Sequence, residues 1–385
     1  MVTLETADKA LKNFYLDAIT RELDSKASPF LAKLEKTSAN VVGKSVTKVV
    51  KLGINGGIGA GTETGDLPKG DSGEYLTFTA PLKNLYGTIE ISDKALRAAA
   101  NNEGAFVNIL NEEMEGLVQS AKYNFSRMLF GRGDGYIGTI VSSGANTYIL
   151  TKSEGIVEGM YLDVWKNGVK THSKIKVALY EKDENKIVVE GADVGSLNIP
   201  DPGSEVRACG SEEGYELTGL SALFSDEPIY GLDRTKAYMN PYVEYINDEI
   251  TEEILQYAID MVEERGGGKV NMILCSRRVR RALTKHFKER QSFFSMTSIG
   301  DNQQVLTYNG IPIVIDSCCP EDVLYLLNTD DFKICQLCDW QWMEGEDGKI
   351  LKQVAGKPVY TATLVKYAEL ICQKPCGQGM IGGIE

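Results

Sequence analysis

Four cysteines form the arrangement in this sequence that is best suited to binding a metal. Cys335 and Cys338 are separated by two residues, and Cys372 and Cys376 are separated by three. Paired thiolates at such spacings can hold one zinc ion in tetrahedral geometry. The residues around Cys335 and Cys338 have a strand pattern, however, and the spacing of all eight cysteines is irregular. We therefore favour buried, reduced thiols, with a zinc or redox protein as an alternative.

Two short motifs could suggest a ligand. Residues 56–61 are glycine-rich like a phosphate-binding loop, but they lack the dinucleotide spacing, a following Lys-Ser or Lys-Thr pair and a predicted helix. We interpret them as a flexible loop tip. Residues 132–134 are Arg-Gly-Asp, an integrin-binding tripeptide, but so short a match in a glycine turn is most often a coincidence. An adhesin that uses this motif is a further alternative.

The densest basic run begins with Arg277, Arg278, Arg280 and Arg281 and continues to Arg290. These side chains could contact phosphate, but the chain as a whole carries a net charge of −13, which repels nucleic acid at long range. Carboxylates on a neighbouring subunit, or solvent, are the favoured contacts.

The side chains that general acid–base catalysis requires are not grouped in this sequence. The two histidines, His172 and His286, have no nearby nucleophile with an orienting acid. Paired glutamates at 112–113, 252–253 and 263–264 fall on solvated helix faces, unlike the carboxylates of a glycoside hydrolase. We therefore predict no enzymatic activity and no cofactor.

Size and composition indicate a globular protein of more than one unit. The chain has 385 residues, of which 43% are hydrophobic and 25% charged, which suits two or three compact units of typical domain size. Its apolar runs fall short of the roughly 20 residues that a membrane span needs. We expect the protein to stay in the compartment where it is made.

One long amphipathic helix is the strongest local pattern. Apolar residues recur at steps of three and four from Phe106 to Leu129, and Gly131 follows them. At 1.5 Å per residue this helix would be roughly 40 Å long. A short helix capped by Ser92 is predicted before it, at 93–100. We expect the long helix to be the spine of the molecule.

A long two-stranded excursion precedes the helices. Residues 43–52 and 74–79 have strand patterns, and the glycine-rich residues 53–73 join them. Such an excursion has little sequence with which to bury its own apolar side chains. We expect it to reach a neighbouring chain.

The rest of the chain alternates between short strands and helices. From about 138 to 210, short strands and turns such as Asn167-Gly168 predict a small β-barrel or sandwich. An amphipathic helix is then predicted from Ile246 to Gly266, and a Ser276-capped helix from 277 to about 288. The strands expected in this part lie at 270–275, 311–315, 323–327, 332–338 and 359–372. The fold class is therefore α+β.

The order of these elements resembles the major capsid proteins of tailed phages and prophages, which share the Hong Kong 97 fold. One stretch that carries the resemblance is the strand and spine start at 88–107. The others are 214–224, 266–281, 308–316 and the Trp340–Met343 region. No stretch is a catalytic fingerprint, and the resemblance depends on their order along the chain.

The resemblance implies a specific organisation of the chain. It implies an N-arm at 1–40, an E-loop at 41–87, a peripheral domain with the spine helix at 88–139, a β-rich insertion domain at 140–212, a return to the peripheral domain at 213–245, an axial domain at 246–330, and the remaining axial and peripheral strands at 331–385.

The resemblance also implies a function and partners. The chain would assemble as hexamers and pentamers into an icosahedral shell around double-stranded phage DNA, in the host cytoplasm. Its partners would be copies of itself, a scaffold protein, a portal protein and a decoration protein on the insertion domain, with no membrane. An encapsulin shell, which encloses enzyme cargo, shares the fold and is the nearest alternative.

Three groups of residues are predicted to make assembly contacts. They are Lys48, Lys51 and Lys69 on the E-loop; Glu112, Glu113 and Arg127 on the spine; and Arg277, Arg278, Arg280 and Arg281 on the basic helix. The founding relative crosslinks an E-loop lysine to a neighbouring asparagine. Lys69 is suitably placed for this, but no asparagine partner is matched.

Overall fold

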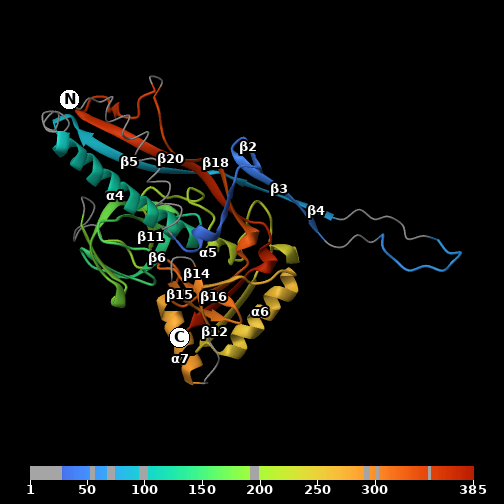
Figure 1. Cartoon of the computed structure of the whole chain (residues 1–385). Coiled ribbons are helices and arrows are strands. Elements are labelled where there is room, and N and C mark those ends of the chain that lie inside the picture. The colour runs from blue at the N-terminus through green and yellow to red at the C-terminus, as the bar shows by residue number, and fades with distance from the viewer. Residues whose placement is uncertain are drawn as a thin grey trace.

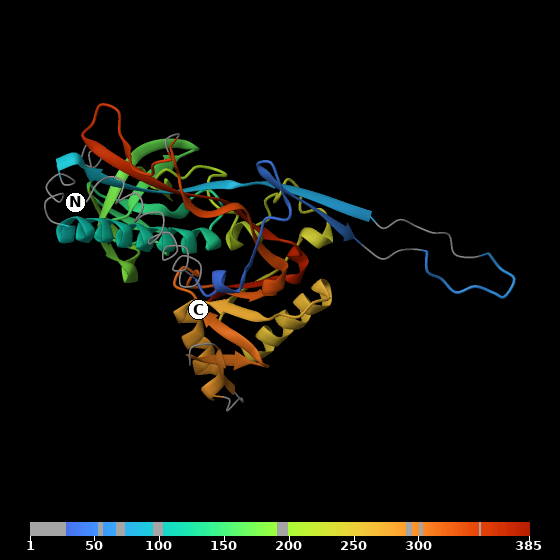
Figure 2. The same ribbon diagram turned by 45° about the horizontal axis from the view of Figure 1, so that its top comes forward.

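The computed structural model describes residues 28–52, 57–66, 74–94, 103–190, 199–289, 295–299, 303–345 and 348–385. Figure 1 shows a body from which the hairpin of β3 and β4 extends to one side, and Figure 2 shows the same extension from a second direction. The body contains a five-stranded sheet, a closed barrel and a seven-stranded sheet.

The five-stranded sheet is organised by its longest strand, β20 (Val359–Cys372). On one side, β20 pairs antiparallel with β5 (Lys83–Ser92) along the whole of β5. On the other side it pairs with β18 (Phe332–Trp342), which also pairs in parallel with β1 (Glu35–Thr37). The short strand β19 (Lys352–Gln353) completes this sheet.

The predicted long helix is confirmed as α4 (Glu103–Phe130), of 28 residues, or about 42 Å at 1.5 Å per residue. It lies beside β5 and β20 in Figures 1 and 2. Its buried face packs into the main core. Of the short helix predicted at 93–100, only Asp93 and Lys94 are described, and both are helical.

The predicted small β unit is a closed barrel with the strand order β10-β7-β6-β11-β8-β9. Asn167 and Gly168 both have positive φ, at 50° and 76°, as the predicted tight hairpin turn requires. The barrel has its own apolar core. Its strands are β6 (Tyr136–Ser143), β7 (Thr147–Leu150), β8 (Tyr161–Lys166), β9 (Val169–Glu181), β10 (Lys186–Glu190) and β11 (Glu205–Ala208).

A seven-stranded mixed sheet forms the lower part of the molecule in Figure 1. Two helices, α6 (Glu252–Gly266) and α7 (Arg277–Glu289), pack on one of its faces. In spatial order its strands are β12 (Tyr242–Asp248), β21 (Gly379–Ile384), β17 (Leu324–Leu327), β13 (Met272–Cys275), β16 (Ile311–Ile315), β15 (Gln303–Tyr308) and β14 (Ser295–Ile299).

The predicted start of one helix is wrong. Ile246 was expected in the first turn, but it lies in β12, and α6 begins at Glu252. The hydroxyl of Thr251 caps the helix by accepting a hydrogen bond from the Ile254 N–H at 3.3 Å. Asn247, with φ of 46°, has a left-handed backbone conformation near the end of β12, before this cap. The apolar spacing therefore extends upstream of the true start of the helix, into the preceding strand.

The hairpin β3 (Ser45–Leu52) and β4 (Glu74–Pro81) confirms the predicted two-stranded excursion. A third strand, β2 (Val41–Val42), pairs with β3 near the body. Residues 58–66 of the loop are exposed. The remaining short helices are η2 (Leu31–Lys33), η3 (Lys182–Glu184), α5 (Leu220–Leu223), η4 (Ala237–Met239), η5 (Thr329–Asp331) and η6 (Pro375–Gly377).

The central strands β13 and β17 separate two cores. Ile273 and Leu326 face α6 and α7, whereas Leu274 and Tyr325 face the main core with α4 and the five-stranded sheet. Both strands are buried along their whole length. Burial on both faces explains why they are continuous apolar runs without alternation.

The barrel core is expected to be sensitive to side-chain truncation. Ile187 has no exposed surface, whereas Ile149 on a neighbouring strand is 39% exposed. We expect Ile187→Ala to lower the free energy of unfolding by about 2–4 kcal/mol, because the truncation leaves a cavity. Ile149→Ala is the matched control and should cost clearly less. Denaturant unfolding of the full chain measures both, and equal losses would contradict a closed apolar core.

Candidate functional site

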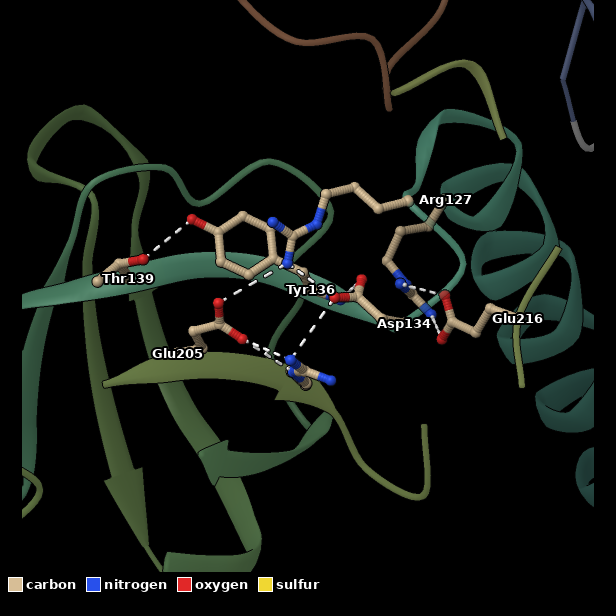
Figure 3. A network of polar contacts seen from close by, with 8 residues as sticks. Arg127, Asp134, Tyr136, Thr139, Glu205 and Glu216 are labelled. Atoms are coloured by element: carbon tan, nitrogen blue, oxygen red, sulfur yellow. Dashed lines mark hydrogen bonds and ion pairs between the residues drawn. The ribbon is translucent and has the colours of Figure 1, made fainter. Parts of the chain in front are cut away.

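A buried ion pair joins the spine helix to the segment that returns from the barrel. Arg127 on α4 and Glu216 form two hydrogen bonds, Nη1 to Oε2 at 3.0 Å and Nη2 to Oε1 at 2.5 Å (Figure 3). The side chains are only 7% and 3% exposed. The Ser211 hydroxyl also donates to Glu216. This bidentate pairing fixes the end of α4 to residues 211–216.

A second, more exposed network lies where the chain enters the barrel (Figure 3). Arg132 pairs with Asp134 at 2.7 Å and lies 3.9 Å from the centre of the Tyr136 ring. Arg207 on β11 pairs with Glu205 at 2.6 Å and lies 3.6 Å from Asp134. Both charged groups of the Arg-Gly-Asp tripeptide therefore contact residues of this chain, and they link β6 to β11.

A buried carboxylate connects β20 to the same return segment. Glu369 has no exposed surface and accepts hydrogen bonds from the backbone N–H groups of Thr218 and Leu370 at 2.8 and 2.9 Å. Lys83 on β5 lies 3.6 Å away and donates to the carbonyl of Gly214 at 2.8 Å. Burial raises the pKa of the Glu369 carboxyl to about 7, although Lys83 and the hydrogen bonds oppose this shift.

A fully buried lysine holds β20 to β18. Lys366 donates to the Asp339 carboxylate at 2.6 Å and lies 6.0 and 5.6 Å from the ring centres of Phe125 and Trp340. Burial alone would raise the pKa of Asp339, but the hydrogen bond and charge of Lys366 lower it overall. The ammonium group is thus neutralised by one carboxylate and enclosed by aromatic faces.

A cavity of about 860 Å³ lies between β5, α4 and residues 208–216. Lys83, Arg127 and Glu216 line it. Each of these three charged groups contacts another charged group of the chain. These internal pairs hold the spine helix, the five-stranded sheet and the barrel together, and we call this region the spine-to-barrel joint.

The residues predicted for assembly do not form one cluster. On β3, Lys51 is exposed, and Lys48 is partly buried, which together with nearby Lys333 lowers its pKa. Lys69 and the side chain of Glu112 lie outside the described residues, whereas Glu113 is exposed on α4.

The predicted arginines differ sharply in their surroundings. Arg277, Arg278, Arg280 and Arg281 are exposed on α7. Arg127, in contrast, is buried and paired within the chain.

The two cysteine pairs are not arranged as one site. Strand register places Cys335 opposite Glu369 and Cys338 opposite Tyr367, while Cys372 lies opposite Phe332. All eight cysteines are free thiols. Within the described ranges, no three His, Cys, Asp or Glu side chains are grouped to hold a metal. Among the helices of the described residues, none could span a membrane.

Arg127 was predicted only as an assembly contact, and the other buried charges of these joints were not predicted from the sequence. Lys366 and Glu369 lie within the otherwise apolar stretch 363–372, and a charge inside a buried strand is a signal that could have identified them. Glu216 gives no such signal, because its partner Arg127 is distant in sequence.

Comparison with known proteins agrees with this architecture. Residues 205–349 match the family model described as SU10 major capsid protein. No curated protein sequence matches the chain. Among solved structures, the capsid of cyanophage A-1(L) has a TM-score of 0.56 at 13% identity, covering 92% of each chain. The capsid of a native GTA particle has a TM-score of 0.47 at 10% identity, covering 92% of this chain and 90% of that one.

A further solved structure is an encapsulin complex from Synechococcus elongatus. It has a TM-score of 0.48 at 9% identity, and the match covers 94% of this chain and 89% of that chain.

The fold and the family match point to the same class of protein. The chain has the α+β Hong Kong 97-type capsid fold, as predicted. Within that fold, residues 205–349 are similar to SU10 major capsid protein, and this match supports a major capsid protein of the tailed-phage type. The resemblance inferred from the sequence is therefore confirmed.

The Arg127–Glu216 pair should be strongly coupled. We expect Arg127→Met to lower the free energy of unfolding by about 3–5 kcal/mol, because Glu216 would remain buried without its countercharge. Replacing both residues by methionine should recover part of this loss. Lys176→Met, which breaks the exposed Lys176–Glu190 pair, should cost clearly less, because solvent screens an exposed pair. Denaturant unfolding of these three variants and of Glu216→Met measures the coupling, and additive losses from the two single changes at the buried pair would contradict it.

The buried Glu369 should make stability depend on pH. Because its pKa is raised in the folded state to about 7, the folded chain binds more protons than the unfolded chain between about pH 4.5 and 7. Its contribution to stability therefore falls as pH rises through this window. Glu369→Gln, which cannot ionise, should gain stability relative to the natural chain by about 1–3 kcal/mol between pH 5 and 7.5.

Unfolding midpoints of both chains at the two pH values test this expectation. The matched control is Glu158→Gln, the same change at an exposed position. If the difference in stability between Glu369→Gln and the natural chain does not change with pH, the Glu369 carboxyl of the folded chain is already charged across this pH range.

Proposed function

We propose that this capsid protein assembles with copies of itself as hexamers and pentamers into an icosahedral shell around double-stranded DNA. The observation that carries the proposal is the β3–β4 hairpin, which extends from the body (Figures 1 and 2). Val49 and Tyr75 on it are 57% and 62% exposed, and Val42 on the adjoining strand β2 is 69% exposed. A two-stranded hairpin with exposed apolar side chains is marginal alone, so contact with a neighbouring subunit would stabilise it.

The domain organisation belongs to the same proposal. Residues 1–40 would be the N-arm, 41–87 the E-loop, 88–139 the first peripheral segment, 213–245 the peripheral return and 246–330 the axial domain. The strands of 331–385 would complete both domains. The closed barrel supports an insertion domain at 140–212, carried on the outer surface and able to bind a decoration protein.

The remaining partners follow from the same proposal. A scaffold protein and a portal protein would be further partners, with assembly in the host cytoplasm. DNA would be enclosed without specific binding, because the net charge of −13 disfavours strong adhesion to phosphate. The hairpin lysines Lys48 and Lys51 and the spine residue Glu113 would contact neighbouring subunits. For Arg127, whose side chain is paired internally, we propose a structural role in the spine-to-barrel joint.

Expression of the full chain, alone and with the scaffold encoded beside it, tests the proposal. Electron microscopy should show closed shells or ring-shaped capsomers in at least one sample. Shells that hold DNA after nuclease treatment of a phage lysate support the phage function, whereas shells that hold an enzyme support an encapsulin. A stable monomer in both samples would contradict the proposal.

Assembly should depend on the apolar surface of the hairpin. We expect Val49→Asp to lower the yield of shells at least about tenfold, because a buried carboxylate at a subunit contact costs more than about 1.4 kcal/mol. Val169→Asp changes a barrel residue that is 65% exposed and should leave the yield unchanged. Sedimentation separates shells from free subunits. Equal yields from both variants would indicate that the hairpin makes no subunit contact.

A further inference from the structure

The two helices of the seven-stranded sheet cover opposite ends of one layer. Helix α6 contacts β21 and β12, and α7 contacts β16 nearer the other edge of the sheet. Figures 1 and 2 both show α6 and α7 on opposite sides of this part of the molecule. A neighbouring copy placed alongside could therefore bring its α6 to the α7 of this chain.

The outer surface of α7 is strongly basic. Val279 and Leu283 are buried against the sheet, and the other side of the helix exposes Arg277, Arg278, Arg280 and Arg281, which we call the basic face. Among the described residues, no carboxylate lies within ion-pair distance of these four guanidinium groups. Arginines in a first helical turn also oppose the helix dipole, so local stability does not explain their presence.

The outer surface of α6 has the opposite charge. Glu253, Tyr257, Asp260 and Glu264 follow one another at steps of four, three and four, and all are exposed; we call them the acidic row. The opposite side of the helix, including Leu255 and Val262, is buried. In the part of the chain that the structure describes, the three carboxylates of the row form no ion pair. The ring of Tyr257, 55% exposed, lies in the middle of the row.

The acidic row and the basic face match in charge and in helical spacing. Arg277 and Arg281 are four residues apart, as are Asp260 and Glu264, so two facing helices can present paired charges one turn apart. An exposed tyrosine between carboxylates also offers an aromatic face on which a guanidinium group can stack.

We propose that the basic face of α7 binds the acidic row of α6 on a neighbouring copy of this chain. The inference rests on the proposed function and identifies, within it, the partner surface of the α7 arginines. Nucleic acid is the competing partner for a basic face. A second copy is favoured because this chain itself supplies the complementary acidic surface, whereas its net charge of −13 repels phosphate.

Charge exchange between the two surfaces tests the proposal in the full chain. Arg277→Glu with Arg281→Glu changes the net charge by −4, and Asp260→Lys with Glu264→Lys changes it by +4. Each pair alone should lower the yield of shells at least about tenfold, and the four changes together should restore most of it. Glutamate at position 277 in the first turn of α7 and lysine at position 264 in the last turn of α6 suit the helix dipoles, and positions 260 and 281 are exposed, so folding should be preserved. Thermal unfolding of the free subunits checks this.

A matched combination separates specific pairing from net charge. The two α7 changes combined with Glu158→Lys and Glu184→Lys, at exposed barrel positions, have the same net charge as the four-residue exchange but should not restore assembly. If any variant fails to fold, Arg277→Gln with Arg281→Gln removes the charges without reversing them and should also lower the yield.

The outcomes separate a failure of the α7–α6 pairing from a failure of the proposed shell assembly. If the natural chain forms no shells, the proposed function itself fails. If it forms shells but the four-residue exchange restores no more than the barrel combination, the pairing of α7 with α6 is wrong. Normal shells from the α7 variant that retain less DNA would also overturn the inference and assign the basic face to nucleic acid.

Discussion

Strand β20 is paired on both sides, and this pairing sets the positions of the elements around it. Its backbone is hydrogen-bonded to β5 on one side and to β18 on the other, so it joins segments from both ends of the chain. The spine α4 packs beside β5. Because Lys366 and Glu369 lie on this buried strand and each meets an opposite charge, a shift in its register would leave both charges unpaired in the core. The register is therefore strongly specified.

Buried ion pairs and exposed side chains are found in different parts of the molecule. Around the base of the barrel, buried pairs such as Arg127–Glu216 hold spine and return segment together with little exposed surface. On the lower sheet and the hairpin, by contrast, charged and apolar side chains face outward in ordered rows. Fixed internal joints suit a subunit that must keep its shape, while the outward rows suit contacts between subunits.

The sequence predicted the elements with strong periodicity, and it missed those that depend on distant partners. The spine α4 and the hairpin β3–β4 follow from residue spacing, and the capsid fold followed from their order. Strand β21 was missed because its glycine-rich sequence has little strand character, and it forms only because β12 and β17 pair with it. The joint at Glu216 and Glu369 was missed for the same reason, because no local pattern shows which distant charges will meet.

The barrel begins and ends at one point of the fold. Its first strand, β6, pairs with its last, β11, and Tyr136 lies directly opposite Arg207. The roughly 70 residues between them start and finish about 5 Å apart, the usual separation of paired residues on neighbouring strands. The frame of spine and sheets therefore needs only a short bridge at this point. Any module with adjacent termini could therefore replace the barrel while the frame of spine and sheets keeps its architecture.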